Sequence, residues 1–139
     1  MLPLRYASWW RTASVLLLIL VLAGAVMPAV WLWPDRGTLF SWFDAIDKSV
    51  HAVVFAFLTL WFAGQYRPQS YWRIALGLLL FGLLIELCQR TIIYRSAEWL
   101  DVAADVAGII GGLLIAATGL GGWCQRFEAR YLTQRDSRD

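Results

Sequence analysis

Apolar residues along the chain gather in four long blocks, separated by short stretches that hold most of the charges. The first block, residues 12–34, has no charged residue and exceeds the ~20 residues that a helix needs to cross a hydrocarbon core about 30 Å thick. The others cover residues 49–66, 71–93 and 99–123. The third crosses only if it carries Glu86 and Gln89 into the bilayer, and a re-entrant segment is the alternative. The pattern predicts an all-α, polytopic membrane protein with four transmembrane helices.

Composition agrees with lipid as the solvent. Hydrophobic residues make up 60% of the chain and charged residues 16%, whereas a soluble domain carries about 25% charge. A chain this apolar is not disordered, and a net charge of +2 from scattered basic residues is too small to imply a nucleic-acid partner, so we expect none. The length corresponds to a single membrane domain, residues 1–125, followed by a short cytoplasmic tail, residues 126–139, that we interpret as solvated.

The basic residues orient the four predicted helices. Most of the twelve Lys and Arg residues fall on the side that holds both termini, and cytoplasmic loops are enriched in these residues. Both termini are therefore expected in the cytoplasm. A cleaved signal peptide is the alternative for the first block, but the apolar part of a signal has only about 7–15 residues.

Polar residues of three predicted helices converge near the outer leaflet. An ionised side chain at the centre of a membrane helix costs at least about 2.5–3.5 kcal/mol on insertion scales. Glu86 and Asp105 are therefore expected to be paired, hydrated or protonated. The residues predicted at a similar depth are His51, Glu86, Gln89 and Asp105. Asp47 and Lys48 are predicted at the outer end of the second helix, and Asp101 near the outer boundary of the fourth.

The fourth predicted helix carries small residues on the face of its two aspartates. Asp101, Asp105, Gly108 and Gly112 follow one another at helical spacing, and small residues mark close helix packing in membranes. This face should point into the helix bundle. Packing against a helix of the same chain is the first interpretation, and a homo-oligomer through Gly108 and Gly112 is the alternative.

The polar residues also form an ordered pattern: Asp47-Lys48-x-x-His51-x-x-x-Phe55, then Glu86-x-x-Gln89, then Arg95 followed by Asp101, Asp105 and Gly108. This pattern, which lies within residues 47–112, resembles the VanZ-like family of small bacterial membrane proteins. The family usually has Asn at the position of Asp105. The resemblance implies the bacterial cytoplasmic (inner) membrane and an envelope-facing role, since the family is named for a protein linked to low-level teicoplanin resistance. It implies no particular reaction.

Three classes of function remain open. In an enzyme acting on a cell-envelope lipid or a lipid-linked precursor, His51 would be the general acid or base, assisted by Glu86 or Asp105. Lys48 and Arg95 would hold phosphate, and Asp47, Gln89 and Asp101 complete the candidate ligand-binding set. A binding module would use the same groups without turnover. A proton-coupled carrier is disfavoured because residues 74–85 and 106–117 hold no ionisable group.

Each polar residue also has a purely structural interpretation. His51 alone is more typical of a hydrogen-bonded histidine at the membrane interface than of a base, and Glu86 with Gln89 is compatible with an interhelical hydrogen bond. A divalent metal held by His51, Glu86 and Asp105 is an alternative, but these residues lack a diagnostic ligand spacing. We expect no metal and no cofactor, and membrane lipids or a lipid-linked precursor as partners.

Overall fold

A computed structural model describes residues 1–26, 40–90 and 99–132, with the backbone alone at residues 40–47 and 132. The described residues form helices and no strand. The long helices are α1 (Ala7–Val26), α2 (Phe40–Gln65), α3 (Tyr71–Arg90) and α4 (Trp99–Ile115). Shorter helical segments are η2 (Pro68–Ser70), η3 (Ala116–Leu120), α5 (Trp123–Phe127) and η4 (Glu128–Leu132).

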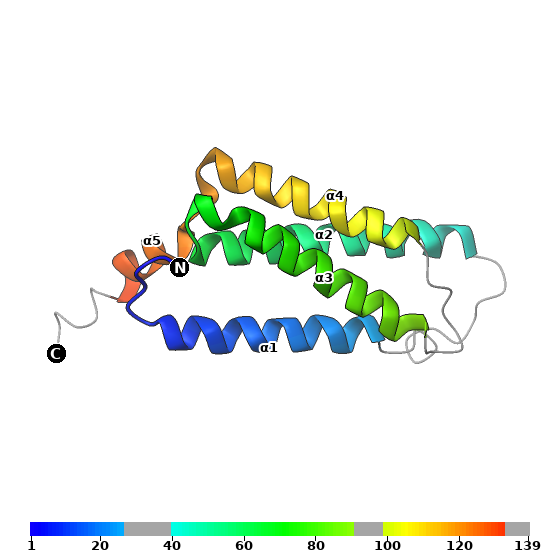
Figure 1. The fold of residues 1–139 in the computed structure, drawn as a ribbon, viewed down its shortest axis with the longest axis horizontal. Helices are drawn as coiled ribbons and strands as arrows, with labels where there is room; N and C mark the ends of the chain where they lie inside the picture. The colour runs from blue at the N-terminus through cyan, green and yellow to red at the C-terminus, as the bar shows by residue number, and fades with distance from the viewer. Residues whose placement is uncertain (27–39, 91–98, 133–139) are drawn as a thin grey trace.

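The four long helices lie lengthwise and alternate in direction (Figure 1). The most extensive contact joins α2 to α4, and α3 packs against both, while α1 lies against α3. The N-terminus and α5 lie at the same end of the molecule (Figure 1). We call this the terminal end, and the end where α3 finishes and α4 begins the opposite end.

Within the described residues, three helical stretches are long and apolar enough to cross a membrane: Ala7–Val26, Pro68–Arg90 and Trp99–Leu120. Each presents large apolar side chains to the exterior, such as Leu20, Leu80 and Leu114, as helices in lipid do. The third predicted block is one unbroken helix to Arg90, as expected of a span and not of a re-entrant segment. The helix α2, which contains the second block, is not among these three stretches.

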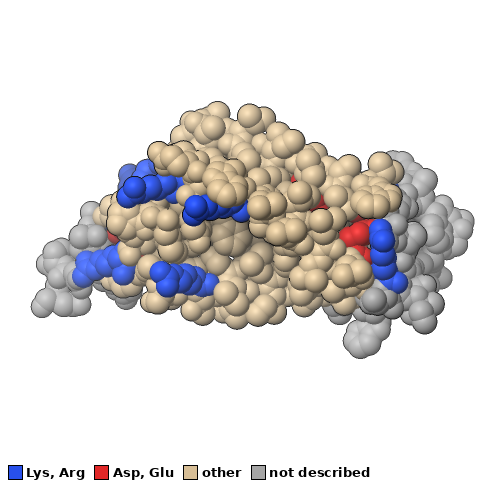
Figure 2. All heavy atoms as spheres, viewed as in Figure 1, with Lys and Arg blue, Asp and Glu red and all other residues tan. Residues whose placement is uncertain are grey.

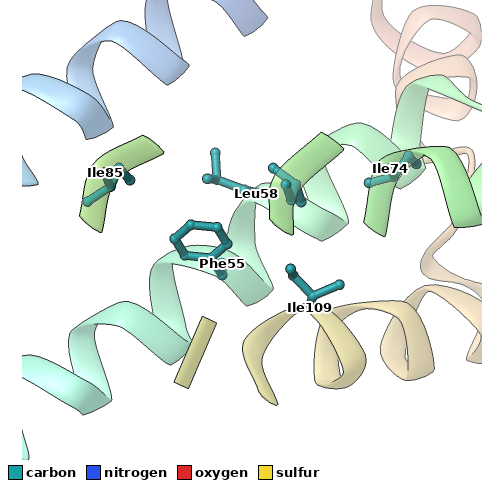
Figure 3. Close-up of a cluster of buried hydrophobic side chains, with 6 residues drawn as sticks. Phe55, Leu58, Ile74, Ile85 and Ile109 are labelled. Atoms are coloured by element: carbon teal, nitrogen blue, oxygen red, sulfur yellow. The ribbon is translucent and has the colours of Figure 1, made fainter. Parts of the chain in front are cut away.

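The centre of the helix assembly is a cluster of buried apolar side chains from α2, α3 and α4. The cluster contains Phe55 and Leu58 of α2, Ile74 and Ile85 of α3 and Ile109 of α4, and Figure 3 shows these side chains in the space between the three helices. Lipid tails are as apolar as these side chains, so close van der Waals packing holds the helices together more than removal from water does.

Glycine makes the α2–α4 contact possible. A Cβ atom at Gly108 would collide with the carbonyl oxygen of Ala52, and one at Gly112 would lie 2.7 Å from the carbonyl oxygen of Ala56. Both carbonyl oxygens belong to the backbone of α2, so they cannot move away as the end of a flexible side chain could. The two predicted interface glycines therefore pack within the chain, and a homo-oligomer through them would require α2 and α4 to separate.

The terminal end is closed by a buried carboxylate. Glu128 accepts hydrogen bonds from the backbone N–H groups of Arg5 (2.8 Å) and Tyr6 (3.1 Å) and from Nε1 of Trp10 (2.8 Å). The first N–H groups of a helix have no partner within it, and a carboxylate there also complements the helix dipole. With this cap, α1 begins at Ala7, earlier than the start predicted at residue 12. The cap also shows that Glu128, in the predicted tail, is buried and not solvated.

We predict that Gly108→Leu destabilises the protein by at least about 1–3 kcal/mol, because an added side chain must push α2 away from α4. Gly111→Leu is the matched control, since a Cβ atom at Gly111 meets nothing within 4 Å. Thermal unfolding of the purified protein in detergent measures both. Equal melting temperatures for the two variants would contradict the close α2–α4 contact.

We predict that Glu128→Ala lowers the free energy of unfolding by about 1–3 kcal/mol or more, because three N–H donors lose their acceptor. Glu128→Gln keeps a side-chain oxygen and should lose less. Arg130→Ala changes an exposed residue of the same segment and should stay within about 0.5 kcal/mol of the wild type. A loss for Arg130→Ala as large as that for Glu128→Ala would argue against the cap.

Candidate functional site

Polar side chains are buried on the three helices that pack around Phe55. His51 lies on α2, Glu86 on α3 and Asp105 on α4, and each is less than one-tenth exposed. Gln89 and Asp101 are buried as well. These side chains are enclosed by helices whose outer surfaces are apolar, so each must find a partner inside the protein or in a ligand.

His51 and Asp105 form a direct contact between α2 and α4. Nδ1 of His51 lies 2.9 Å from Oδ1 of Asp105, with 9% of the histidine side chain and 2% of the aspartate side chain exposed. In the tautomer that carries its proton on Nδ1, the ring donates this hydrogen bond to the carboxylate, which fixes the orientation of the ring, and Nε2 is the second proton-exchanging atom. The pair can therefore accept or donate a proton at Nε2, the geometry that general acid–base catalysis uses.

The third helix contacts this pair through a glycine. A Cβ atom at Gly82 of α3 would lie 2.5 Å from Oδ2 of Asp105 and 3.3 Å from the ring of Phe55. The missing side chain at Gly82 thus provides the space that the Asp105 carboxyl group occupies. Gly82 was not among the predicted site residues. Its only signal in the sequence is its position one helical turn before Glu86.

Among the buried side-chain oxygen and nitrogen atoms of the described residues, one lacks a hydrogen-bond partner. This atom is Oε1 of Glu86. The carboxyl group lies within electrostatic range of His51, Arg90, Asp101 and Asp105. A buried polar atom without a partner costs about 1–3 kcal/mol, and more when it belongs to a charged group. Such an atom in a folded protein calls for an explanation, and a missing ligand is one.

The predicted ligand-binding residues have different environments in the structure. Nε2 of Gln89 donates a hydrogen bond to the carbonyl oxygen of Ala25 (3.1 Å) and so ties α3 to the last turn of α1. Asp101 lies in the first turn of α4, where a carboxylate complements the helix dipole. Lys48 lies three residues before His51 on α2 and is half-buried. Arg95 and the side chain of Asp47 lie outside the described residues.

No three His, Cys, Asp or Glu side chains are arranged to hold a metal ion in the described parts of the chain. The alternative in which His51, Glu86 and Asp105 share a divalent metal therefore gains no support from the geometry. What the three residues offer is a proton-exchanging pair beside a carboxyl group with a vacant hydrogen-bonding oxygen.

Comparison with known proteins gives one match. The model of the VanZ/LLP1 family matches residues 9–120, a stretch that includes most of α1 and every residue of the buried polar group. Neither the curated proteins nor the solved structures yielded a match. The family match confirms the resemblance that the order of polar residues had indicated.

We predict an energetic coupling of about 1–3 kcal/mol between His51 and Asp105, because each single substitution leaves a buried polar partner unpaired. A double-mutant cycle with His51→Ala and Asp105→Ala, measured by unfolding in detergent, gives this value. The control cycle combines His51→Ala with Thr118→Ala, which changes an exposed residue of η3. Additivity within about 0.5 kcal/mol in both cycles would mean that the pair contributes nothing.

Proposed function

The chain belongs to the VanZ/LLP1 family, and we propose that it is a bacterial cytoplasmic membrane protein that binds or acts on a cell-envelope lipid or a lipid-linked envelope precursor. The ligand occupies the polar group on α2, α3 and α4, at the extracytoplasmic leaflet. The resemblance to the VanZ-like family, which is named for a protein linked to teicoplanin resistance, extends the proposal to an effect on susceptibility to this glycopeptide.

One observation carries this proposal: His51, Glu86 and Asp105 are buried together between apolar helices. Ionisable groups inside a membrane protein are costly, and they most often mark a ligand or proton site. The contact between His51 and Asp105 accounts for two of these groups structurally. It does not account for the Oε1 atom of Glu86, which supports a ligand as the missing partner.

The proposed topology has four spans, with α2 as the second and both termini in the cytoplasm. Three features support it. The N-terminus and α5 lie at the same end (Figure 1), as an even number of crossings requires. Most of the Lys and Arg side chains visible in Figure 2 gather toward that end, in agreement with the positive-inside rule. The extensive contact of α2 with α4, a candidate span, supports α2 lying in the bilayer with it.

The same geometry serves binding or catalysis. As a binding site, the group would hold a headgroup by hydrogen bonds to Glu86 and His51, with Lys48 and Arg95 supplying positive charge for phosphate. As a catalytic site, Nε2 of His51 would transfer the proton while Asp105 holds the ring in place. The catalytic version is favoured by the 2.9 Å contact between Nδ1 and the carboxylate. Proton-coupled transport gains no comparable support.

We predict that Leu100→Cys, at the exposed start of α4, reacts with a membrane-impermeant maleimide added to intact cells. Gln69→Cys, in the α2–α3 connection, should react only after permeabilisation. Both cysteine variants are made in a protein that also carries Cys88→Ser, which removes the native thiol at that position. Cys124 can stay, because burial raises the pKa of its thiol to about 12 and the protonated thiol does not react. Labelling of Gln69→Cys alone in intact cells would overturn the orientation.

We predict saturable binding of a phospholipid or a polyprenyl phosphate to the purified protein. Loss of one hydrogen bond to a charged group, about 1.5–3 kcal/mol, should weaken this binding at least about tenfold in His51→Ala and in Glu86→Gln. Radiolabelled lipid measures binding and product in one assay. Product that depends on His51 would establish an enzyme, binding without product a binding module, and the lack of both would refute the proposal.

A further inference from the structure

The buried polar group contains more acid than base. Glu86, Asp101 and Asp105 are buried acids, whereas His51 is the buried group in the described residues that can carry positive charge. Nδ1 of His51 lies 2.9 Å from Oδ1 of Asp105, whereas Oε1 of Glu86 has no hydrogen-bond partner among the described residues. Taking a carboxylate out of water without a partner is strongly unfavourable. An ionised Glu86 in this group therefore calls for a positively charged hydrogen-bond donor.

The nearest basic residue on α3 does not supply that donor to Glu86. Arg90 follows Glu86 by one turn, but its side chain is exposed and its guanidinium lies over the ring of Trp99, 5.7 Å from the centroid. This cation–π contact holds the guanidinium at the surface of the opposite end. The Oε1 atom of Glu86 stays without a hydrogen bond from any described residue.

We infer that the ligand presents a primary ammonium group to Glu86, as the headgroup of a zwitterionic phospholipid such as phosphatidylethanolamine does. This inference rests on the proposed function, since it names the headgroup of the lipid bound at that site. The ammonium group supplies both the charge and the N–H donor that Oε1 lacks. The adjacent phosphate of the same headgroup would face Lys48, which lies on the same side of α2 as His51.

Two other cations fit the group less well. The trimethylammonium of phosphatidylcholine has the same charge but no N–H, so it leaves Oε1 without a hydrogen bond. A divalent metal needs several oxygen or nitrogen ligands at once, and no three suitable side chains are so arranged in the described ranges. The most specific prediction of the inference is therefore that the protein distinguishes an ammonium group with N–H donors from one without them.

The test titrates the purified, detergent-solubilised protein with phosphatidylethanolamine and with phosphatidylcholine of identical acyl chains, and measures bound lipid by native mass spectrometry. The wild type should bind the ethanolamine lipid at least about tenfold more tightly. Glu86→Gln should bring the ratio of the two dissociation constants close to one. Leu84→Ala, which shortens an exposed side chain of α3, should keep the wild-type ratio.

The outcomes separate this inference from the function that it presumes. Equal and saturable binding of both lipids by the wild type, weakened in His51→Ala, would refute the ammonium and leave the lipid site standing. No saturable binding of either lipid, together with none of a polyprenyl phosphate, would refute both. A melting curve checks that Glu86→Gln is folded, and should it unfold, the ratio measured for the wild type decides alone.

Discussion

The close approach of α2 and α4 is the constraint on which the rest of the structure depends. Gly108 and Gly112 let the backbones meet, because any side chain there would strike the carbonyl oxygens of Ala52 and Ala56. At this separation the short side chain of Asp105 reaches His51. Lipid gives helices no hydrophobic reason to associate, so contact between backbones at small residues supplies the stability and sets the position of the pair.

A third helix completes the polar group by the same means. Gly82 leaves room for the Asp105 carboxyl group, and one turn later α3 places Glu86 in the buried interior. The terminal end is secured separately, by the carboxylate of Glu128 at the start of α1. The molecule thus has one carboxylate that satisfies several donors and another, Glu86, with an oxygen that satisfies none in the described chain. The first is explained by folding, and for the second we propose a ligand.

The sequence was sufficient to predict the helices and the burial of His51, Glu86 and Asp105, because long apolar blocks and the cost of charge in lipid are local signals. The sequence was also sufficient to predict that Gly108 lies on the face of α4 that packs inside the protein, because helical spacing fixes which residues share a face. The cap by Glu128 could not be predicted, because it joins segments more than a hundred residues apart. Of the described helices, three qualify as spans by length and hydropathy. The helix α2 does not qualify, because it combines its apolar residues with polar ones.

The central claim is that Glu86 is retained for a ligand and not for folding, and the stability of Glu86→Met tests it most directly. Methionine has a similar length and no polar atom that needs a partner, and replacing an unsatisfied buried acid in this way is neutral or stabilising. The account predicts a melting temperature in detergent equal to or above that of the wild type, together with loss of lipid binding. A marked fall in the melting temperature with lipid binding intact would show that Glu86 supports the fold and would contradict the account.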